Sequence, residues 1–190
     1  LISILLPLIL GITLYFSKIQ NRNLKNIIIG STIGLVVVLN IVLAFFNGKF
    51  DLFNLTPDLN IGFMIDRLGS FFAIAISFVW LLVTIYSFEY MKHEENEDKF
   101  YCFFFLSLAS LMGMCYSRNL ITVYIFFELI TLFSFPLVMH SKTKESISAA
   151  MKYLFYSIGG AFLALIGLFF LVKHSNNGDF TYGGIIDFTK

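Results

Sequence analysis

Charge is scarce in this sequence: aspartate, glutamate, lysine and arginine make up 13% of its 190 residues, and 58% are hydrophobic. Soluble domains carry about 25% charged residues, so this composition excludes an ordinary soluble globular protein. We therefore predict an all-α integral membrane protein surrounded by lipid bilayer. The formal net charge of +1 is uninformative about partners, and because nothing else in the sequence suggests nucleic acid, we expect no nucleic-acid partner.

Cysteine is scarce as well, with only Cys102 and Cys115 in the chain. Both fall in one predicted helix, where thirteen residues separate them by ~20 Å, too far for a disulfide. The sequence has no CxxC motif and no cysteine–histidine cluster, which argues against iron–sulfur, haem and zinc sites. We expect no cofactor and no metal site, so any redox chemistry that involves this protein takes place on other chains.

Long apolar runs, in contrast, fill most of the chain. A helix of roughly 20 apolar residues crosses a bilayer, and the runs predict six spans, at about residues 1–16, 27–46, 68–90, 100–116, 119–139 and 147–172. The spans leave no room for a soluble domain, so we predict that residues 1–190 form a single transmembrane helical domain. The chain begins with leucine and its first apolar run is short, so we expect it to be part of a longer subunit.

The polar segments between the spans predict the connections. Residues 47–66 contain Asn-Gly and Thr-Pro-Asp, turn signals that predict a small hairpin or strand at the membrane surface. We interpret residues 17–26 as a polar loop and the acidic run at residues 94–98 as a solvated loop face. The loops after the first, third and fifth spans hold a small excess of lysine and arginine, which favours placing them in the cytoplasm.

Glu128 is the residue most indicative of function, because it lies near the middle of the fifth apolar run. A carboxylate at mid-membrane costs roughly 3 kcal/mol or more, so an intramembrane acid is by default a functional candidate. Lys152, in the sixth span, is the nearest intramembrane base in the sequence. We predict that the two form a proton relay. Two structural alternatives stay open, an ion pair that only holds the helices together and a lysine that extends to the membrane edge.

Other polar residues lie on the same faces. Tyr124, Glu128 and Thr131 share one face of the fifth span by helical spacing, and Lys152 and Tyr156 share one face of the sixth. Their hydroxyls either hold water for proton transfer or satisfy one another between helices. His140 ends the helix that carries Glu128, which makes it a candidate proton entry group. Gly160, Ala164 and Gly167 recur at helical spacing and predict close helix contact.

Three stretches carry a family resemblance: IGFMIDRLGSFFAIAISFVWLLVTIYSFEYM, SRNLITVYIFFELITLFSFPLV and SISAAMKYLFYSIGGAFLALIGLFFL. Their order and spacing resemble the antiporter-like, proton-translocating membrane subunits of respiratory complex I, Mrp-type antiporters and membrane-bound hydrogenases. The resemblance covers about residues 61–171. Phe127 stands where many members have tryptophan, and Phe135-Pro136 departs from the commoner Tyr-Leu pair.

The resemblance implies the N-terminal part of an inverted-repeat fold. It also implies that Glu128 matches the glutamate essential to pumping and that Lys152 matches a further intramembrane lysine. The glutamate's main family partner, a lysine on the next helix, would follow Lys190. We therefore expect a non-redox subunit of a proton-pumping oxidoreductase, hydrogenase or Mrp-type complex, with other membrane subunits as partners and H⁺ or Na⁺ as the transported ion. The expected location is the bacterial cytoplasmic membrane or an organellar inner membrane. The alternatives are a non-catalytic membrane scaffold and a stand-alone cation channel or carrier.

Overall fold

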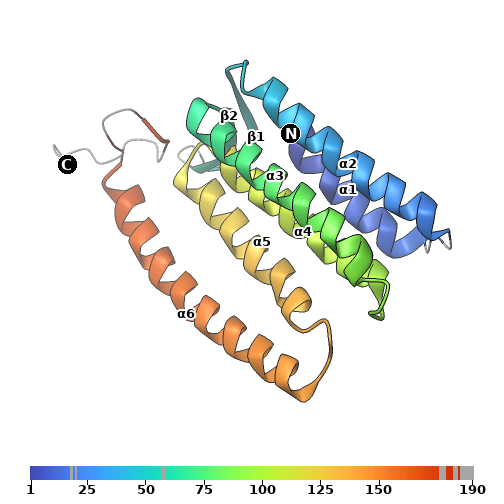
Figure 1. Cartoon of the computed structure of the whole chain (residues 1–190). Helices are drawn as coiled ribbons and strands as arrows, with labels where there is room; N and C mark the ends of the chain where they lie inside the picture. The colour runs from blue at the N-terminus through green and yellow to red at the C-terminus, as the bar shows by residue number, and fades with distance from the viewer. Residues whose placement is uncertain (18, 20, 57–58, 176–178, 182–183, 185–190) are drawn as a thin grey trace.

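A computed structural model describes residues 1–17, 19, 21–56, 59–175, 179–181 and 184 (Figure 1). Its elements are α1 Ile2–Ser17, α2 Arg22–Leu43, β1 Gly48–Thr56, β2 Leu59–Ile65, α3 Arg67–Tyr90, α4 Glu97–Cys115, α5 Leu120–Val138 and α6 Lys144–Lys173. The helices run alternately up and down, so the protein has two ends. We call the end with β1, β2 and residues 116–119 the hairpin end, and the end with residues 91–96 and 139–143 the loop end.

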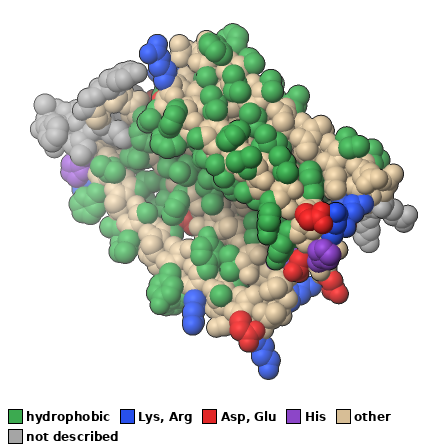
Figure 2. Space-filling model, in the orientation of Figure 1, with side chains coloured by type: hydrophobic (Ala, Val, Ile, Leu, Met, Phe, Trp, Pro, Cys, Tyr) green, Lys and Arg blue, Asp and Glu red, His purple; other side chains and the backbone are tan. Residues whose placement is uncertain are grey.

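The helices match the predicted membrane fold. Five of them, α2 to α6, are long and apolar enough to cross a membrane, and α1 is a shorter apolar helix of 16 residues. Apolar side chains are spread over the face seen in Figure 2, and charged side chains lie mainly toward its edges. This distribution suits a protein surrounded by lipid, because the apolar surface is too large for a soluble monomer. The prediction of an integral membrane helical protein is confirmed.

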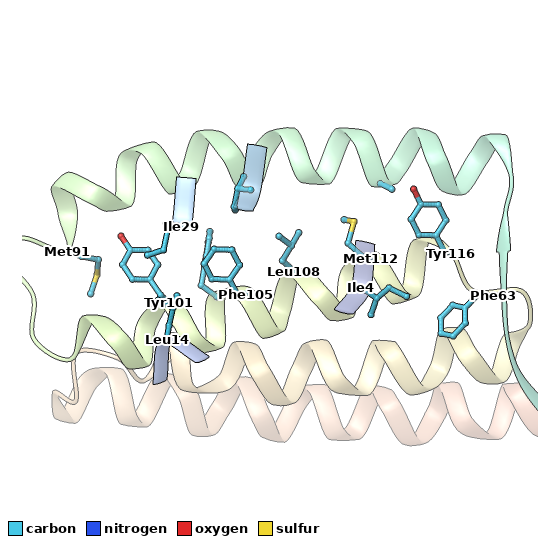
Figure 3. Close-up of a cluster of buried hydrophobic side chains, with 13 residues drawn as sticks. Ile4, Leu14, Ile29, Phe63, Met91, Tyr101, Phe105, Leu108, Met112 and Tyr116 are labelled. Atoms are coloured by element: carbon cyan, nitrogen blue, oxygen red, sulfur yellow. The ribbon is translucent and has the colours of Figure 1, made fainter. Parts of the chain in front are cut away.

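The centre of the bundle is α4, which packs against α1, α3 and α5. In the most hydrophobic 18-residue segment of α4, 56% of the residues are buried. In the corresponding segment of α6, only 6% are buried. Side chains from α4 run along the core in a row (Figure 3): Tyr101, Phe105, Leu108, Met112 and, just past the helix end, Tyr116. The other helices therefore take their positions from α4, and α6, which contacts α5, lies outermost.

Close approach of α4 and α5 depends on Gly113. A Cβ atom at this position would lie 2.2 Å from the ring of Phe126 on α5. Real Cβ atoms do not approach other atoms so closely, so the missing side chain makes room for the ring. This contact holds α5, the helix that carries Glu128, against the core.

Polar side chains start each of the outer helices. Asn119 caps α5 by accepting a hydrogen bond from the Thr122 backbone N–H at 2.8 Å, and Asp66 caps α3 through the Gly69 N–H at 2.7 Å. Thr143 caps α6 in the same way through the Ser146 N–H. Such caps satisfy backbone donors that have no partner inside the helix. The Asn119 cap sets where α5 begins, and hence the depth of Glu128.

The predicted hairpin is confirmed as an antiparallel pair of strands, β1 and β2. Its second strand is bonded to the turn between α4 and α5: the Arg118 N–H donates to the Gly62 carbonyl at 2.9 Å, and the Met64 N–H donates to the Tyr116 carbonyl at 2.7 Å. The Gly62 N–H in turn donates to the Thr122 hydroxyl on α5. The hairpin is thus attached to the first turn of α5. The turn at residues 57–58 lies outside the described residues.

Arg118 strengthens this attachment with two ion pairs, to Asp51 of β1 at 2.8 Å and to Asp179, beyond α6, at 2.6 Å. Partial burial by itself lowers the pKa of the Arg118 guanidinium, but the hydrogen bonds and charges of Asp179 and Asp51 outweigh it, so the pKa is raised. The guanidinium therefore stays charged, and it joins three separate segments at the hairpin end.

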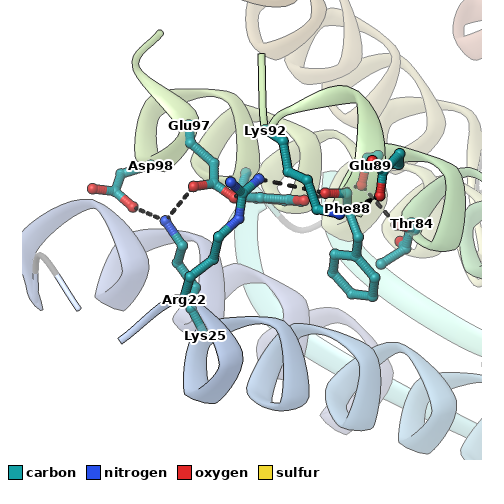
Figure 4. A network of polar contacts seen from close by, with 10 residues as sticks. Arg22, Lys25, Thr84, Phe88, Glu89, Lys92, Glu97 and Asp98 are labelled. Carbon is teal, nitrogen blue, oxygen red and sulfur yellow. Dashed lines mark hydrogen bonds and ion pairs between the residues drawn. The ribbon is translucent and has the colours of Figure 1, made fainter. Parts of the chain in front are cut away.

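At the loop end, the position of Lys25 shows that two predictions were wrong: the polar loop at residues 17–26 and the solvated acidic run at residues 94–98 (Figure 4). α2 begins at Arg22, so Lys25 lies in its first turns rather than in a polar loop, and its side chain is only 7% exposed. Its ammonium group donates to Glu97 at 2.9 Å and to Asp98 at 2.8 Å. These two acids belong to α4, so they are not part of a solvated loop face. A buried ammonium needs such partners, since burial without a counter-charge is costly.

Replacing Lys25 with methionine is expected to destabilise the protein. The change leaves the carboxylates of Glu97 and Asp98 side by side, with the Arg22 guanidinium, 3.7 Å from Glu97, as their remaining described cation. Breaking a fully buried pair costs about 3–5 kcal/mol, and because the Asp98 side chain is 34% exposed we expect a smaller loss, on the order of 2 kcal/mol. Thermal unfolding of the purified protein measures it. Lys92→Met is the matched control, because Lys92 pairs with Glu89 where both side chains are exposed. Equal unfolding midpoints for the two variants would contradict the expectation.

Candidate functional site

Glu128 lies in the middle of α5, eight residues after Leu120 and ten before Val138. At 1.5 Å per residue the carboxylate-bearing position is ~12 Å from one helix end and ~15 Å from the other. The residue is partly buried, and its Oε1 atom is buried with no hydrogen-bond partner among the described residues. Over the same residues Glu128 forms no ion pair. A carboxylate oxygen with this much unused bonding capacity is unusual in a native structure.

The face of α5 that carries Glu128 is turned toward α6. Tyr124, one turn before Glu128, lies within reach of its carboxylate and donates a hydrogen bond to the Ala161 carbonyl of α6 at 3.3 Å. Thr131 is buried, and its hydroxyl donates to the Phe127 carbonyl in its own helix. Of these two hydroxyls, one is therefore bonded to a neighbouring helix and the other to its own backbone.

Two hydrogen bonds define how α6 lies along α5. Near the loop end the hydroxyls of Ser134 and Tyr153 are 2.6 Å apart, and toward the hairpin end Tyr124 reaches Ala161. Ten residues of α5 thus correspond to eight of α6, in antiparallel directions. Interpolation between the two contacts places Glu128 level with roughly Ser157. Lys152, next to Tyr153, lies ~9 Å from that level along the helix axis.

The structure does not bring Lys152 and Glu128 together. Lys152 is exposed and forms no ion pair with any described residue. Tyr156, on the same face, is 75% exposed. This face of α6 therefore points away from α5. Gly160 and Gly167 also have open space around them, so the close helix contact predicted at these glycines is absent among the described residues.

His140 follows the end of α5 at the loop end. Its ring meets that of Phe100 on α4 edge to face, with centroids 5.5 Å apart. Its Nε2 atom is buried and has no hydrogen-bond partner in the described part of the chain. His140 thus lies just past the end of the helix that carries Glu128, twelve residues nearer the loop end, or ~18 Å.

The sequence analysis did not predict the polar pair that joins α5 and α6, Ser134 and Tyr153. A signal was present: Ala150, Tyr153, Ser157 and Ala161 recur at intervals of three or four, and Ala150 and Ala161 are buried. The sequence analysis instead selected the face of the helix that carries Lys152 and Tyr156. A cavity of about 400 Å³ also exists, but its described lining residues are Tyr15, Phe16, Asn96, Asp98 and Lys99, none of them from α5 or α6.

Two family descriptions match separate parts of the chain. Residues 54–101 match "NADH-Ubiquinone oxidoreductase (complex I), chain 5 N-terminus". Residues 117–187 match "NADH:quinone oxidoreductase/Mrp antiporter, TM". The second match contains all of α5 and α6, and with them Glu128 and Lys152.

Curated relatives agree with these matches. NAD(P)H-quinone oxidoreductase subunit 5 of the chloroplast of Marchantia polymorpha is 36% identical over 117 residues, covering 60% of this chain and 17% of the relative. The same subunit of Chaetosphaeridium globosum is 32% identical over 85% of this chain and 27% of its own length. Antiporter subunit mnhA2 of Staphylococcus saprophyticus is 33% identical over 60% of this chain and 14% of its own length. The chain spans about a quarter or less of each relative's length.

Two solved structures share the fold. A chain of the membrane-bound sulfane sulfur reductase, an archaeal respiratory membrane complex, superposes with a TM-score of 0.76 at 22% identity, covering 91% of this chain and 37% of that chain. A chain of the Mrp complex from Dietzia sp. gives a TM-score of 0.76 at 14% identity, over 90% of this chain and 19% of that chain. Both likenesses concern the arrangement of the helices.

Proposed function

The chain belongs to the antiporter-like membrane subunits of the NADH:quinone oxidoreductase and Mrp family, and from this premise we propose that it forms the N-terminal part of a subunit that moves protons or sodium ions across a membrane. Such a subunit carries no redox centre of its own and works beside other membrane subunits of a larger complex. Lipid covers the apolar outer faces of α2, α3 and α6. Glu128 is the residue through which the ion passes, or whose protonation controls that passage.

The single observation that carries the proposal is the state of the Glu128 carboxylate. It lies at mid-depth in α5, partly buried, with an Oε1 atom that lacks any described hydrogen-bond partner. A carboxylate oxygen without a partner at this depth can accept a hydrogen bond or bind an ion that enters the membrane. Moving one charge against 100 mV costs ~2.3 kcal/mol. Exposing or unpairing a buried charge costs several kcal/mol. The free-energy change when Glu128 gains or loses a charged partner is therefore large enough to move a proton against such a potential.

We assign to Lys152 the role of a movable cation in this switch. Its ammonium group is free of described ion pairs, and the flexible side chain starts ~9 Å along the helix axis from the level of Glu128. In the described conformation the lysine faces outward. A rotation of α6, or contact with another part of the complex, brings it toward the carboxylate and favours the ionised form. The relay thus alternates between a protonated, unpaired Glu128 and an ionised Glu128 that faces a cation.

Ion transport by the assembled complex tests the proposal. The complex that contains this subunit is reconstituted into vesicles, and internal acidification and sodium uptake are followed separately during turnover. We expect the wild type to move one of the two ions and the Glu128→Gln variant to move neither at a comparable rate. Full transport by the variant would contradict the proposal and favour the alternative of a non-catalytic membrane scaffold.

Replacing Lys152 with alanine is expected to reduce pumping about tenfold with little loss of assembly. An exposed lysine contributes little to packing. Removal of a cation that pairs with Glu128 in part of the cycle, in contrast, raises the free-energy barrier to ion transfer by on the order of 1–2 kcal/mol. Transport per assembled complex, measured in vesicles, checks this. Lys144→Ala, also exposed and at the start of the same helix, is the matched control. Loss of assembly with unchanged transport per complex would show that Lys152 is structural.

A further inference from the structure

The face of α6 that packs against α5 carries one hydroxyl near the depth of Glu128. Ala150, Tyr153, Ser157 and Ala161 lie on one face by helical spacing, and the first and last of them are buried. Tyr153 and Ser157 are partly buried, while the residues beside them on the outer face are exposed. Figure 1 shows α6 alongside α5 over most of its length. Ser157 therefore points into the α5–α6 contact.

The register of the two helices brings Ser157 to the level of Glu128. The Ser134–Tyr153 contact of 2.6 Å and the Tyr124–Ala161 contact of 3.3 Å bracket this level on both sides. Glu128 lies six residues from Ser134 and four from Tyr124, so its counterpart lies between Tyr153 and Ala161, at about Ser157. Tyr124, which bonds to α6, also reaches the Glu128 carboxylate. The carboxylate and the serine thus share one small stretch of the interface.

Both groups have unused hydrogen-bonding capacity. The Ser157 hydroxyl forms no hydrogen bond with any described residue, although a serine inside a helix commonly donates to a carbonyl three or four positions earlier. Ser134 does so, to Thr131, and Ser110 does so, to Leu106. The Glu128 Oε1 atom is buried and also lacks a described partner. An orphaned acceptor and a free donor at one depth of one interface complement each other.

We propose that the Ser157 hydroxyl is the hydrogen-bond partner of the Glu128 carboxylate and positions it for proton exchange. When Glu128 is ionised, the serine O–H donates to the carboxylate. When Glu128 is protonated, the carboxyl O–H donates to the serine oxygen, so the serine neither gains nor loses a proton overall. The transported proton reaches and leaves Glu128 along the ion path. The role in transport rests on the proposed function, whereas the hydrogen bond itself does not.

The elements packed around Glu128 carry titratable and charged groups of their own. These are Tyr124 on α5 and His140 just past its end, Lys144, Glu145, Lys152, Tyr153, Tyr156 and Lys173 on α6, and Glu97, Asp98, Lys99, Tyr101, Cys102 and Cys115 on α4. Lys99, Lys144, Glu145 and Lys173 lie at the ends of their helices. Glu97 and Asp98 are paired with Lys25, and Tyr101 is bonded to Ser87 of α3. Tyr153 is bonded to Ser134. Tyr124 and Lys152 are the groups that a change at Ser157 could disturb indirectly.

Replacing Ser157 with alanine tests the proposal in the assembled complex. The serine bonds to both forms of the carboxyl group, but its bond to the ionised form is charge-assisted and stronger. Loss of the serine therefore disfavours the ionised form, and Glu128 holds its proton to higher pH. The pH profile of transport is expected to move ~0.5–1 unit in the alkaline direction, the shift that one hydrogen bond produces. Ser157→Thr keeps the hydroxyl and is expected to restore the wild-type profile. Ser134→Ala is the matched control, because it removes another hydroxyl from the same interface and leaves Ser157 in place.

Infrared spectroscopy provides a readout that does not depend on transport. The carboxyl stretch of protonated Glu128, identified as the band that Glu128→Gln removes, is expected at higher frequency in Ser157→Ala than in wild type, since its hydrogen bond is lost. An unmoved band in Ser157→Ala, or an equal pH shift in Ser134→Ala, would overturn the proposal. If the band moves in Ser157→Ala but Glu128→Gln leaves transport unchanged, the hydrogen bond is supported and the proposed function is contradicted.

Discussion

Replacement of Glu128 with glutamine is expected to lower ion translocation roughly a hundredfold or more, the loss that follows removal of a positioned proton-transfer group. Glutamine has nearly the same shape as glutamate but takes up no proton and offers no charge to a cation. The described carboxylate forms no ion pair that the substitution would break. Glutamine carries no charge whose burial would cost desolvation free energy, so the variant should be as stable as the wild type or more so. Transport falls while stability holds, a combination that a packing role does not produce.

Two further variants sharpen this result. Glu128→Asp keeps the carboxylate but withdraws it by one methylene group, and we expect transport between that of the wild type and that of Glu128→Gln. Glu145→Gln removes an exposed carboxylate from the first turn of α6 and is expected to have no effect. Initial rates of vesicle acidification or sodium uptake, divided by the amount of assembled complex, provide the comparison. Equal rates for Glu128→Gln and Glu145→Gln would remove Glu128 from the mechanism.

Replacement of Gly69 with alanine is expected to cause the largest loss of stability. A Cβ atom at this position would lie 2.2 Å from the backbone carbonyl oxygen of Cys115 and 2.7 Å from the Asp66 carboxylate. A backbone atom at a helix end has little freedom to withdraw, and the Asp66 carboxylate is held there by its cap to the Gly69 N–H. Overpacking in cores costs typically about 1–3 kcal/mol, and we expect the upper part of that range or more. The start of α3 would separate from the end of α4.

The consequence of the Gly69 change reaches beyond the two helices. The end of α4 leads into the turn that holds the hairpin and begins α5, so assembly should suffer as well. Yield of assembled complex and the thermal unfolding midpoint measure the effect. Gly34→Ala is the control, because a Cβ there meets no atom within 4 Å and alanine favours a helix by up to about 1 kcal/mol. Gly69→Ala and Gly34→Ala variants of equal stability would show that α3 and α4 can shift apart at no cost.

Much of the fold followed from the sequence alone, because hydropathy and turn chemistry are local properties. A run of some 20 apolar residues forms a helix in lipid whatever its neighbours are, so α2 to α6 were predicted from composition. Asn-Gly and Thr-Pro-Asp predicted the hairpin, since these residues favour turn conformations. The mid-helix depth of Glu128 followed from counting residues along one helix. Three helix starts were predicted late, at α2, α4 and α6, because charged residues there were interpreted as loop.

The late starts of α2 and α4 have a tertiary cause. Lys25 enters the bundle only because Glu97 and Asp98, some seventy residues later, supply its counter-charge. No local pattern contains this information, since each residue alone looks like part of a polar loop. The same holds for Arg118, whose partners Asp51 and Asp179 belong to distant segments. Charge pairs between remote segments depend on which helices become neighbours, and that choice is made by packing against α4.

The sequence by itself determined that this protein crosses a membrane and carries a carboxylate at mid-depth. Helical spacing also showed which residues share a face with Glu128, because periodicity is a property of one helix. Only the tertiary structure decided which face of α6 meets that carboxylate. Lys152 lies on the exposed face of α6, whereas Ser157 is partly buried on the face that also carries the buried Ala150 and Ala161. The direction of a helix face depends on its neighbour, and the neighbour is set by the packing of the whole bundle.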